Sequence, residues 1–150
     1  MVDRHSRNQL AEGIRALASG LITNDEFEQR VPVGSDDPAI RAVFSEGAWL
    51  LYSDLRQYRL SGKHRVPIQS KKEVARWVLF LKTDQPYQWP TLGGLQKLIF
   101  VVMAVPTFGV FTKLYRSSLA KCGDIDVWPF IRRSDFEEAL KSPVYLNAAL

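Results

Sequence analysis

The sequence predicts a mainly α-helical protein that folds as one small domain, with an N-terminal helical hairpin and extended loops around Trp-Pro pairs. Two observations support this prediction. Apolar side chains recur at intervals of three and four residues in several segments, which is the spacing of one helix face. These segments end at Gly or shortly before Pro, the residues that terminate helices. A chain of 150 residues is also long enough to bury a core within one domain.

The first predicted element is an amphipathic helix over residues 4–19, which ends at Gly20. The apolar positions of its buried face are Leu10, Ala11, Ile14, Leu17 and Ala18. Thr23 and Glu26 then have the spacing of a capping box, in which each side chain binds the backbone N–H of the other residue. They predict a second, short helix over residues 25–30, which folds back against the first as a hairpin.

A change of composition at residues 31–36 marks the predicted boundary between two units. This segment contains Pro, Gly, Ser and Asp, which are typical of turns and linkers. We expect residues 1–33 to form the helical hairpin, which would serve as an interaction module. Residues 37–150 would then form the helical core domain.

Asp37 and Pro38 supply an N-cap and a first-turn proline for a third helix, which we expect to reach about Leu60. The apolar stripe of this helix consists of Ile40, Phe44, Gly47, Leu51, Leu55 and Tyr58. A glycine inside a helix costs about 1 kcal/mol relative to alanine. We therefore expect either a close approach of another helix at Gly47 or a kink there.

Two further capping boxes follow, Ser70 with Glu73 and Ser134 with Glu137. They predict two helices that begin beside these serines. The first of these helices lies within the segment 63–82. This segment holds six Lys or Arg residues and one Glu, so its net charge is +5, whereas the net charge of the whole chain is +4. This basic middle segment predicts a solvated helix face, and the alternative is contact with phosphates or acidic lipid headgroups.

The most apolar stretch of the chain, residues 98–111, lies between Lys97 and Lys113. The fifteen residues between these lysines would span about 22 Å as a helix, which is short of the hydrocarbon core of a bilayer at about 30 Å. We therefore expect no transmembrane span and predict a buried core element instead, followed by a helix over residues 108–121. The β-branched residues leave open a short strand near 98–105, which would make the fold α+β.

Two aromatic-proline elements, one before and one after this stretch, are the best candidates for a binding surface. The candidate residues are Tyr87, Trp89, Trp128, Phe130, Arg132 and Arg133. Aromatic rings beside arginine can stack on a nucleobase or anchor a peptide. The alternative is that each indole folds a loop back over the core, since Trp is usually largely buried.

The sequence contains no recognisable catalytic, cofactor or metal site. Two distant histidines and one cysteine do not supply the three or four ligands of a zinc site, and no phosphate-binding glycine loop is present. The single Cys122 cannot form an internal disulfide, and the N-terminus has no apolar signal segment, so we expect a cytoplasmic protein. An enzyme stays open as the less favoured class, because a site assembled from scattered polar residues leaves no motif.

Two segments resemble known bacterial families. The first lies within residues 10–31 and resembles the short SHOCT-like helical segments, which implies an interaction or oligomerisation module without catalysis. Its matching residues are Leu10, Ile14, Leu17, Gly20, Ile22, Thr23, Glu26 and Phe27. The second, residues 124–140, looks like the closing segment of a family with an upstream Trp-Pro element, here Trp89 and Pro90. This resemblance spans about residues 65–140 and implies no activity.

These observations together predict a soluble, non-enzymatic bacterial protein that acts through protein–protein contacts, with a partner or a second copy. Two alternatives stay open. The protein could attach to a membrane surface, which the apolar stretch and the basic middle segment favour. It could also bind nucleic acid through the basic middle segment, which is less favoured because such modules are usually more basic.

Overall fold

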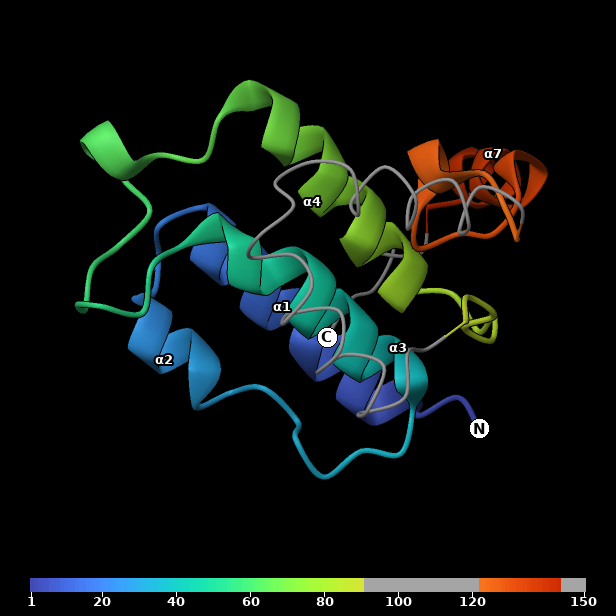
Figure 1. Cartoon of the computed structure of the whole chain (residues 1–150), viewed down its shortest axis with the longest axis horizontal. Coiled ribbons are helices and arrows are strands. Elements are labelled where there is room, and N and C mark those ends of the chain that lie inside the picture. The colour runs from blue at the N-terminus through green and yellow to red at the C-terminus, as the bar shows by residue number, and fades with distance from the viewer. Residues whose placement is uncertain (91–121, 144–150) are drawn as a thin grey trace, which may run out of the picture.

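The computed structural model describes residues 1–90 and 122–143, and in these ranges the protein is mainly helical (Figure 1). The elements are α1 (Arg4–Ala18), α2 (Asn24–Glu28), α3 (Pro38–Ala42), α4 (Ile68–Leu81) and α7 (Arg133–Lys141), with the shorter helical segments η1 (Val43–Gly47), η2 (Ala48–Leu51), η3 (Gly62–His64) and η4 (Ile125–Val127). The described ranges contain no strand, although Thr23 and Arg59 form an isolated antiparallel bridge. The predicted mainly α fold class is thereby confirmed. The apolar stretch 98–111, the strand alternative near 98–105 and the predicted helix 108–121 lie outside the described residues.

The core forms where α1, α3 and α4 pack side by side (Figure 1). Helix α2 packs against α1, and α7 packs against α4. The buried side chains of this cluster include Leu10, Ile14, Leu17, Phe27, Ile40, Val43, Val74, Val78, Phe80, Leu81, Val127 and Phe130. The described residues of the predicted units 1–33 and 37–150 therefore share one hydrophobic core.

The local signals at the start of the chain act as the sequence predicts. Helix α1 begins after Asp3, whose side chain accepts a hydrogen bond from the Ser6 N–H at 3.0 Å. It ends just before Gly20, which has a φ of 74°, a conformation that glycine adopts without strain. Thr23 and Glu26 form both hydrogen bonds of the predicted capping box at the start of α2.

The third helix is shorter than the sequence predicts. Its regular part ends at Ala42, passes through a π-helical turn (η1) and a 3₁₀ turn (η2), and stops at Leu51 instead of about Leu60. The segment that follows is held by the buried Asn24 of α2. The Asn24 amide donates to the carbonyls of Ser53 and Arg56 at 3.2 and 3.0 Å and accepts from the Tyr58 N–H at 2.9 Å. These tertiary hydrogen bonds replace helical ones, and Leu55 of the predicted stripe is 91% exposed.

Of the two features expected at Gly47, the structure shows the close approach. The helix passes through the π-helical turn η1, which ends at Gly47. An added Cβ atom at Gly47 would also lie 3.2–3.3 Å from ring atoms of the Trp77 indole. Helix α4 therefore approaches this turn at a distance that only glycine permits without displacement of Trp77.

The two later capping boxes predicted from the sequence do not form. Helix α4 begins at Ile68, directly after Pro67, so Ser70 already lies inside its first turn. Helix α7 begins at Arg133, and no side chain caps it. Arg133 Nε donates to Asp124 Oδ2 at 2.8 Å, which ties the first turn of α7 to the chain before η4.

Candidate functional site

A buried ion pair joins three helix ends at one side of the core. The Arg7 side chain of α1 is 0% exposed, and its Nε and Nη2 atoms donate to the two carboxylate oxygens of Asp37 at 2.6 and 3.1 Å. Asp37 in turn caps α3 by accepting the Ala39 N–H at 3.0 Å, and it also accepts the Asp3 N–H at 3.0 Å. Burial raises the pKa of Asp37, but these hydrogen bonds, led by those from Arg7, outweigh it and lower the pKa below its ordinary value.

The same arginine also binds the end of α4. Arg7 Nη1 donates to the carbonyls of Thr83 and Gln85 at 3.1 and 2.7 Å, and its guanidinium lies 5.2 Å from the ring centroid of Phe80. Arg4 adds donors to the Leu81 and Thr83 carbonyls. Cations favour the C-terminal end of a helix because its carbonyls lack helical partners. This network fixes α1, α3 and α4 relative to one another, and every polar atom of Arg7 is engaged in structure.

The structure brings the two Trp-Pro elements together. The Trp89 indole N–H donates to the carbonyls of Pro129 and Phe130 at 3.0 and 3.1 Å. The Trp128 indole N–H donates to the Tyr87 hydroxyl at 3.2 Å. The Trp128–Pro129 peptide bond is cis. Each element thus supplies the hydrogen-bond partner of the other, although 38 residues separate Pro90 from Trp128 in sequence.

Burial separates the six candidate residues into two groups. Trp89 is 4% exposed and Phe130 is 0% exposed, and the Phe130 ring packs edge-on against Phe80 with 5.1 Å between centroids. These two rings are part of the core and offer no surface to a partner. Tyr87 and Trp128 are half-buried, and Arg132 and Arg133 are exposed. An interaction role for these four residues stays a prediction.

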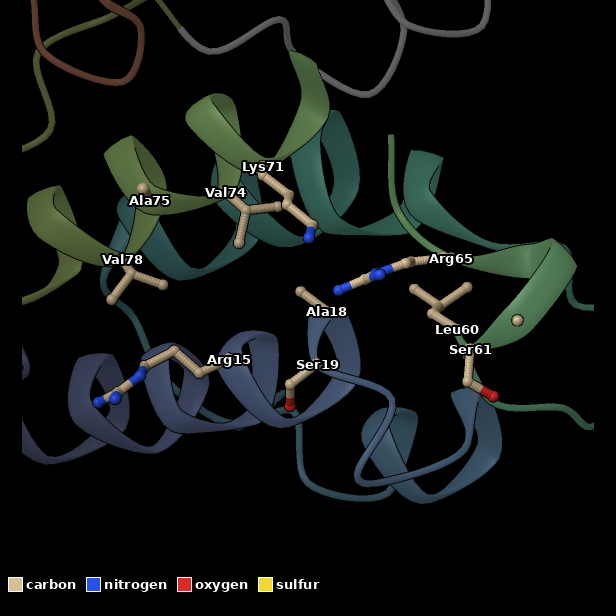
Figure 2. Close-up of a pocket in the computed structure, with 11 residues that line it drawn as sticks. Arg15, Ala18, Ser19, Leu60, Ser61, Arg65, Lys71, Val74, Ala75 and Val78 are labelled. Atoms are coloured by element: carbon tan, nitrogen blue, oxygen red, sulfur yellow. The ribbon is translucent and has the colours of Figure 1, made fainter. Parts of the chain in front are cut away.

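A groove that sequence reasoning missed lies between α1 and α4, closed at one end by the segment around Leu60 (Figure 2). We call it the α1–α4 groove, and its volume is about 700 Å³. Its apolar floor is formed by Ala18, Leu60, Val74, Ala75 and Val78. Its other lining residues are Arg15, Ser19, Ser61, Gly62, Arg65 and Lys71. Small side chains on both helices leave this space open, because neither Ala18 nor Ala75 reaches across it.

The charged residues of the α1–α4 groove are cations. Among the described residues these are Arg15, Arg65 and Lys71, and no acidic residue is part of the described lining. Figure 2 shows Arg65 and Lys71 extending toward each other above Ala18, while Arg15 points away along α1. Arg15 pairs with Glu12 at 3.4 Å. Within residues 1–90 and 122–143, neither Arg65 nor Lys71 forms an ion pair. In the part of the chain that the structure describes, two cations without a carboxylate partner therefore face each other over an apolar floor.

A second, smaller cavity of about 410 Å³ lies at the other end of α4, and its charges are balanced. Arg4 pairs with Asp84 at 3.2 Å, and Lys82, which is 8% exposed, pairs with Glu12 at 2.9 Å. Glu138 of α7 also lines this cavity. Because cations and carboxylates already face each other here, this cavity favours no charged ligand.

The described residues contain no cluster of three or more potential metal ligands. They also contain no helix that is long and apolar enough to cross a membrane. The basic middle segment identified from the sequence supplied Arg65 and Lys71, so its charge was one signal for the groove. Nothing in the sequence indicated that Arg15, Leu60 and Val78 lie beside them, because three separate segments meet there.

Comparison of the chain with protein-family models, with curated proteins and with solved structures finds no match. The resemblances to SHOCT-like segments and to a Trp-Pro family therefore stay predictions. The evidence for function comes from the geometry of the chain itself.

Proposed function

We propose that the protein is a non-catalytic binding protein whose α1–α4 groove takes a small molecule with an apolar body. The observation that supports this proposal is a groove of about 700 Å³ with an apolar floor, because ligand sites usually measure about 300–1,000 Å³ and are lined mainly by apolar side chains. The floor belongs to two packed helices and to Leu60, which is 3% exposed, so it is formed before a ligand arrives. The cytoplasmic location expected from composition is part of this proposal.

The structure offers a way to block this groove without disturbing the core. Ala75 lies in the groove and its side chain is exposed, so a larger side chain there has room to enter the groove. The Ala75→Trp variant should fill the apolar floor while leaving the packing of α1 on α4 intact. Gln69→Trp is the matched control, because Gln69 is also exposed on α4 but does not line the groove.

The test uses Nile red, an uncharged apolar dye whose fluorescence rises when it leaves water. We expect saturable binding at one site for the wild-type protein and for Gln69→Trp, and at least tenfold weaker binding for Ala75→Trp. Circular dichroism and the urea midpoint of each variant report whether it is folded. Equal dye binding by all three proteins, or no saturable binding by the wild-type protein, would rule out the groove as a site.

Protein–protein contact, the role predicted from the sequence, is our second proposal, with a second copy of the chain as the partner. The observation that favours it is the exposure of three large apolar side chains on η2 and just after it. Trp49 is 38% exposed, Leu50 is 76% exposed and Leu55 is 91% exposed. Exposed apolar side chains close in sequence are typical of contact surfaces.

Light scattering over a range of protein concentrations tests this second proposal. We expect the wild-type chain to self-associate and the Leu50→Gln/Leu55→Gln variant to remain a monomer. Leu21→Gln is the control, because Leu21 is an exposed leucine (68%) on a different segment, the turn between α1 and α2. A wild-type chain that is monomeric at every concentration would contradict the proposal.

A further inference from the structure

We infer that the occupant of the α1–α4 groove is an amphiphile with a carboxylate head, bound with its head between Arg65 and Lys71 and its alkyl chain along the apolar floor. This inference rests on the proposed function, because it names the chemistry of the ligand for the same groove. It goes beyond an apolar site by assigning a charge, an orientation and two recognition residues.

The charge of the head follows from the rim. Arg65 and Lys71 extend toward each other from different segments, one before α4 and one in its first turns (Figure 2). Two like charges brought together repel, and within the described residues no carboxylate pairs with either of them. An anion between them removes this repulsion and adds charge-assisted hydrogen bonds. The arginine supplies a planar pair of donors that matches the two oxygens of a carboxylate.

The orientation follows from the uneven charge along the groove. At the end near Val78 the cation of the described lining is Arg15, which Glu12 already partly compensates at 3.4 Å. At the other end Arg65 and Lys71 are uncompensated among the described residues. The head therefore lies between Arg65 and Lys71, and the alkyl chain runs over Ala18 and Val74 toward Val78, where it covers the apolar floor.

A carboxylate is favoured over a phosphate head by the balance of charge and apolar surface. The head meets two cations that no carboxylate of the described residues compensates, and the described lining also holds the hydroxyl groups of Ser19 and Ser61. Built phosphate sites usually add several backbone N–H donors at a helix N-terminus or a glycine-rich turn. The floor, in contrast, is formed by apolar side chains, which suits a ligand whose surface is mostly alkyl chain.

The experiment measures displacement of Nile red by three ligands with the same chain: dodecanoate, methyl dodecanoate and dodecyl phosphate. We expect dodecanoate to bind at least tenfold more tightly than the uncharged methyl ester, and more tightly than the phosphate. The advantage of dodecanoate should shrink as the salt concentration rises, because exposed charges are screened. Binding of the methyl ester should not depend on salt.

Two substitutions that each remove one positive charge test where the carboxylate head binds. Arg65→Gln and Lys71→Gln should each weaken dodecanoate binding about tenfold and leave the binding of the methyl ester and Nile red unchanged. Lys72→Gln is the control, because it removes the same charge from the neighbouring exposed position of α4, which does not line the groove. We expect Lys72→Gln to bind dodecanoate like the wild-type protein.

The outcomes separate the proposed function of the groove from the inference about its ligand. If Ala75→Trp blocks Nile red but dodecanoate and its methyl ester bind equally, the groove is a binding site and the inference about the carboxylate is wrong. Tighter binding of dodecyl phosphate would overturn the choice of carboxylate. An equal loss in Lys71→Gln and Lys72→Gln would show a diffuse charge effect instead of recognition. If no ligand or dye binds, the proposed function itself fails.

Discussion

Replacement of Arg7 by methionine tests whether the buried ion pair holds the three helices together. Methionine has a similar length and keeps the apolar contacts of the side chain, but it removes the charge and all donors. The change leaves the Asp37 carboxylate, which is 2% exposed, without its cation, and the Gln85 carbonyl without the Arg7 donor at 2.7 Å. Breaking a buried ion pair by removing one partner costs about 3–5 kcal/mol. We therefore expect the free energy of unfolding to fall by about that amount.

Urea unfolding followed by far-UV circular dichroism measures this loss, and a thermal scan should show the melting temperature lowered by about 10 °C for a chain of this size. Arg15→Met is the matched control on the same helix, because its ion pair with Glu12 is about half exposed and should contribute at most about 1 kcal/mol. The double variant Arg7→Met/Asp37→Asn should recover at least half of the loss, since asparagine can still cap α3 without a buried charge. A loss for Arg7→Met no larger than that for Arg15→Met would refute the reasoning.

Three further predictions concern packing, hydrogen bonding and pH. Gly47→Ala should lower the free energy of unfolding by about 1–2 kcal/mol in urea titrations, because its Cβ would press on the buried Trp77 ring at 3.2–3.3 Å; an increase in stability would contradict this close approach. Trp89→Phe should lower the free energy of unfolding by about 1–2 kcal/mol, because both hydrogen bonds of the indole are lost. Trp49→Phe is the control, since Trp49 is exposed. Equal losses for the two variants would contradict a role of the Trp89 N–H. Hydrogen bonds from Ser6 and Ser35 lower the pKa of Asp3 from 3.8 to about 2. The contribution of Asp3 to stability is therefore complete above about pH 4 and is lost as the pH falls toward 2. Asp3→Asn should reduce this loss of stability in pH titrations of unfolding, and a pH profile equal to that of the wild-type protein would contradict the prediction.

The elements that sequence reasoning placed correctly are those whose signals are local. Helix α1 follows from apolar spacing within one segment, and the capping box of Thr23 and Glu26 needs only four consecutive residues. Asp37 and Pro38 mark the start of α3 for the same reason. These signals act over one or two helical turns, so the residues next to each other in sequence are sufficient to predict the helix.

The same local signals fail where a tertiary contact competes. A cap contributes about 1 kcal/mol, which is comparable to one or two hydrogen bonds from elsewhere in the chain. Ser70 lost its predicted capping position for a different, local reason, because α4 starts earlier, at Ile68 directly after Pro67. The helix predicted to reach Leu60 stops at Leu51, and Asn24 binds the backbone of the segment that follows.

The candidate site was only partly predictable. The sequence identified the basic middle segment that contains Arg65 and Lys71, and it identified the aromatic residues that join the two Trp-Pro elements. It did not indicate that Trp89 and Phe130 lie in the core, or that small side chains of α1 and α4 leave a groove. A groove depends on how two helix surfaces meet, so the sequence of one segment cannot predict it.

The sequence by itself determined that this protein is helical, where most of its helices lie and which segment is basic, because periodicity, caps and charge are properties of short stretches. The tertiary structure alone decided that Arg7 becomes a buried partner of Asp37, which lies 30 residues away in the chain. It also decided that Arg65 and Lys71 face each other over an apolar floor. The physical reason is that burial and charge pairing depend on the packing of distant segments, and packing is set only when the whole core forms.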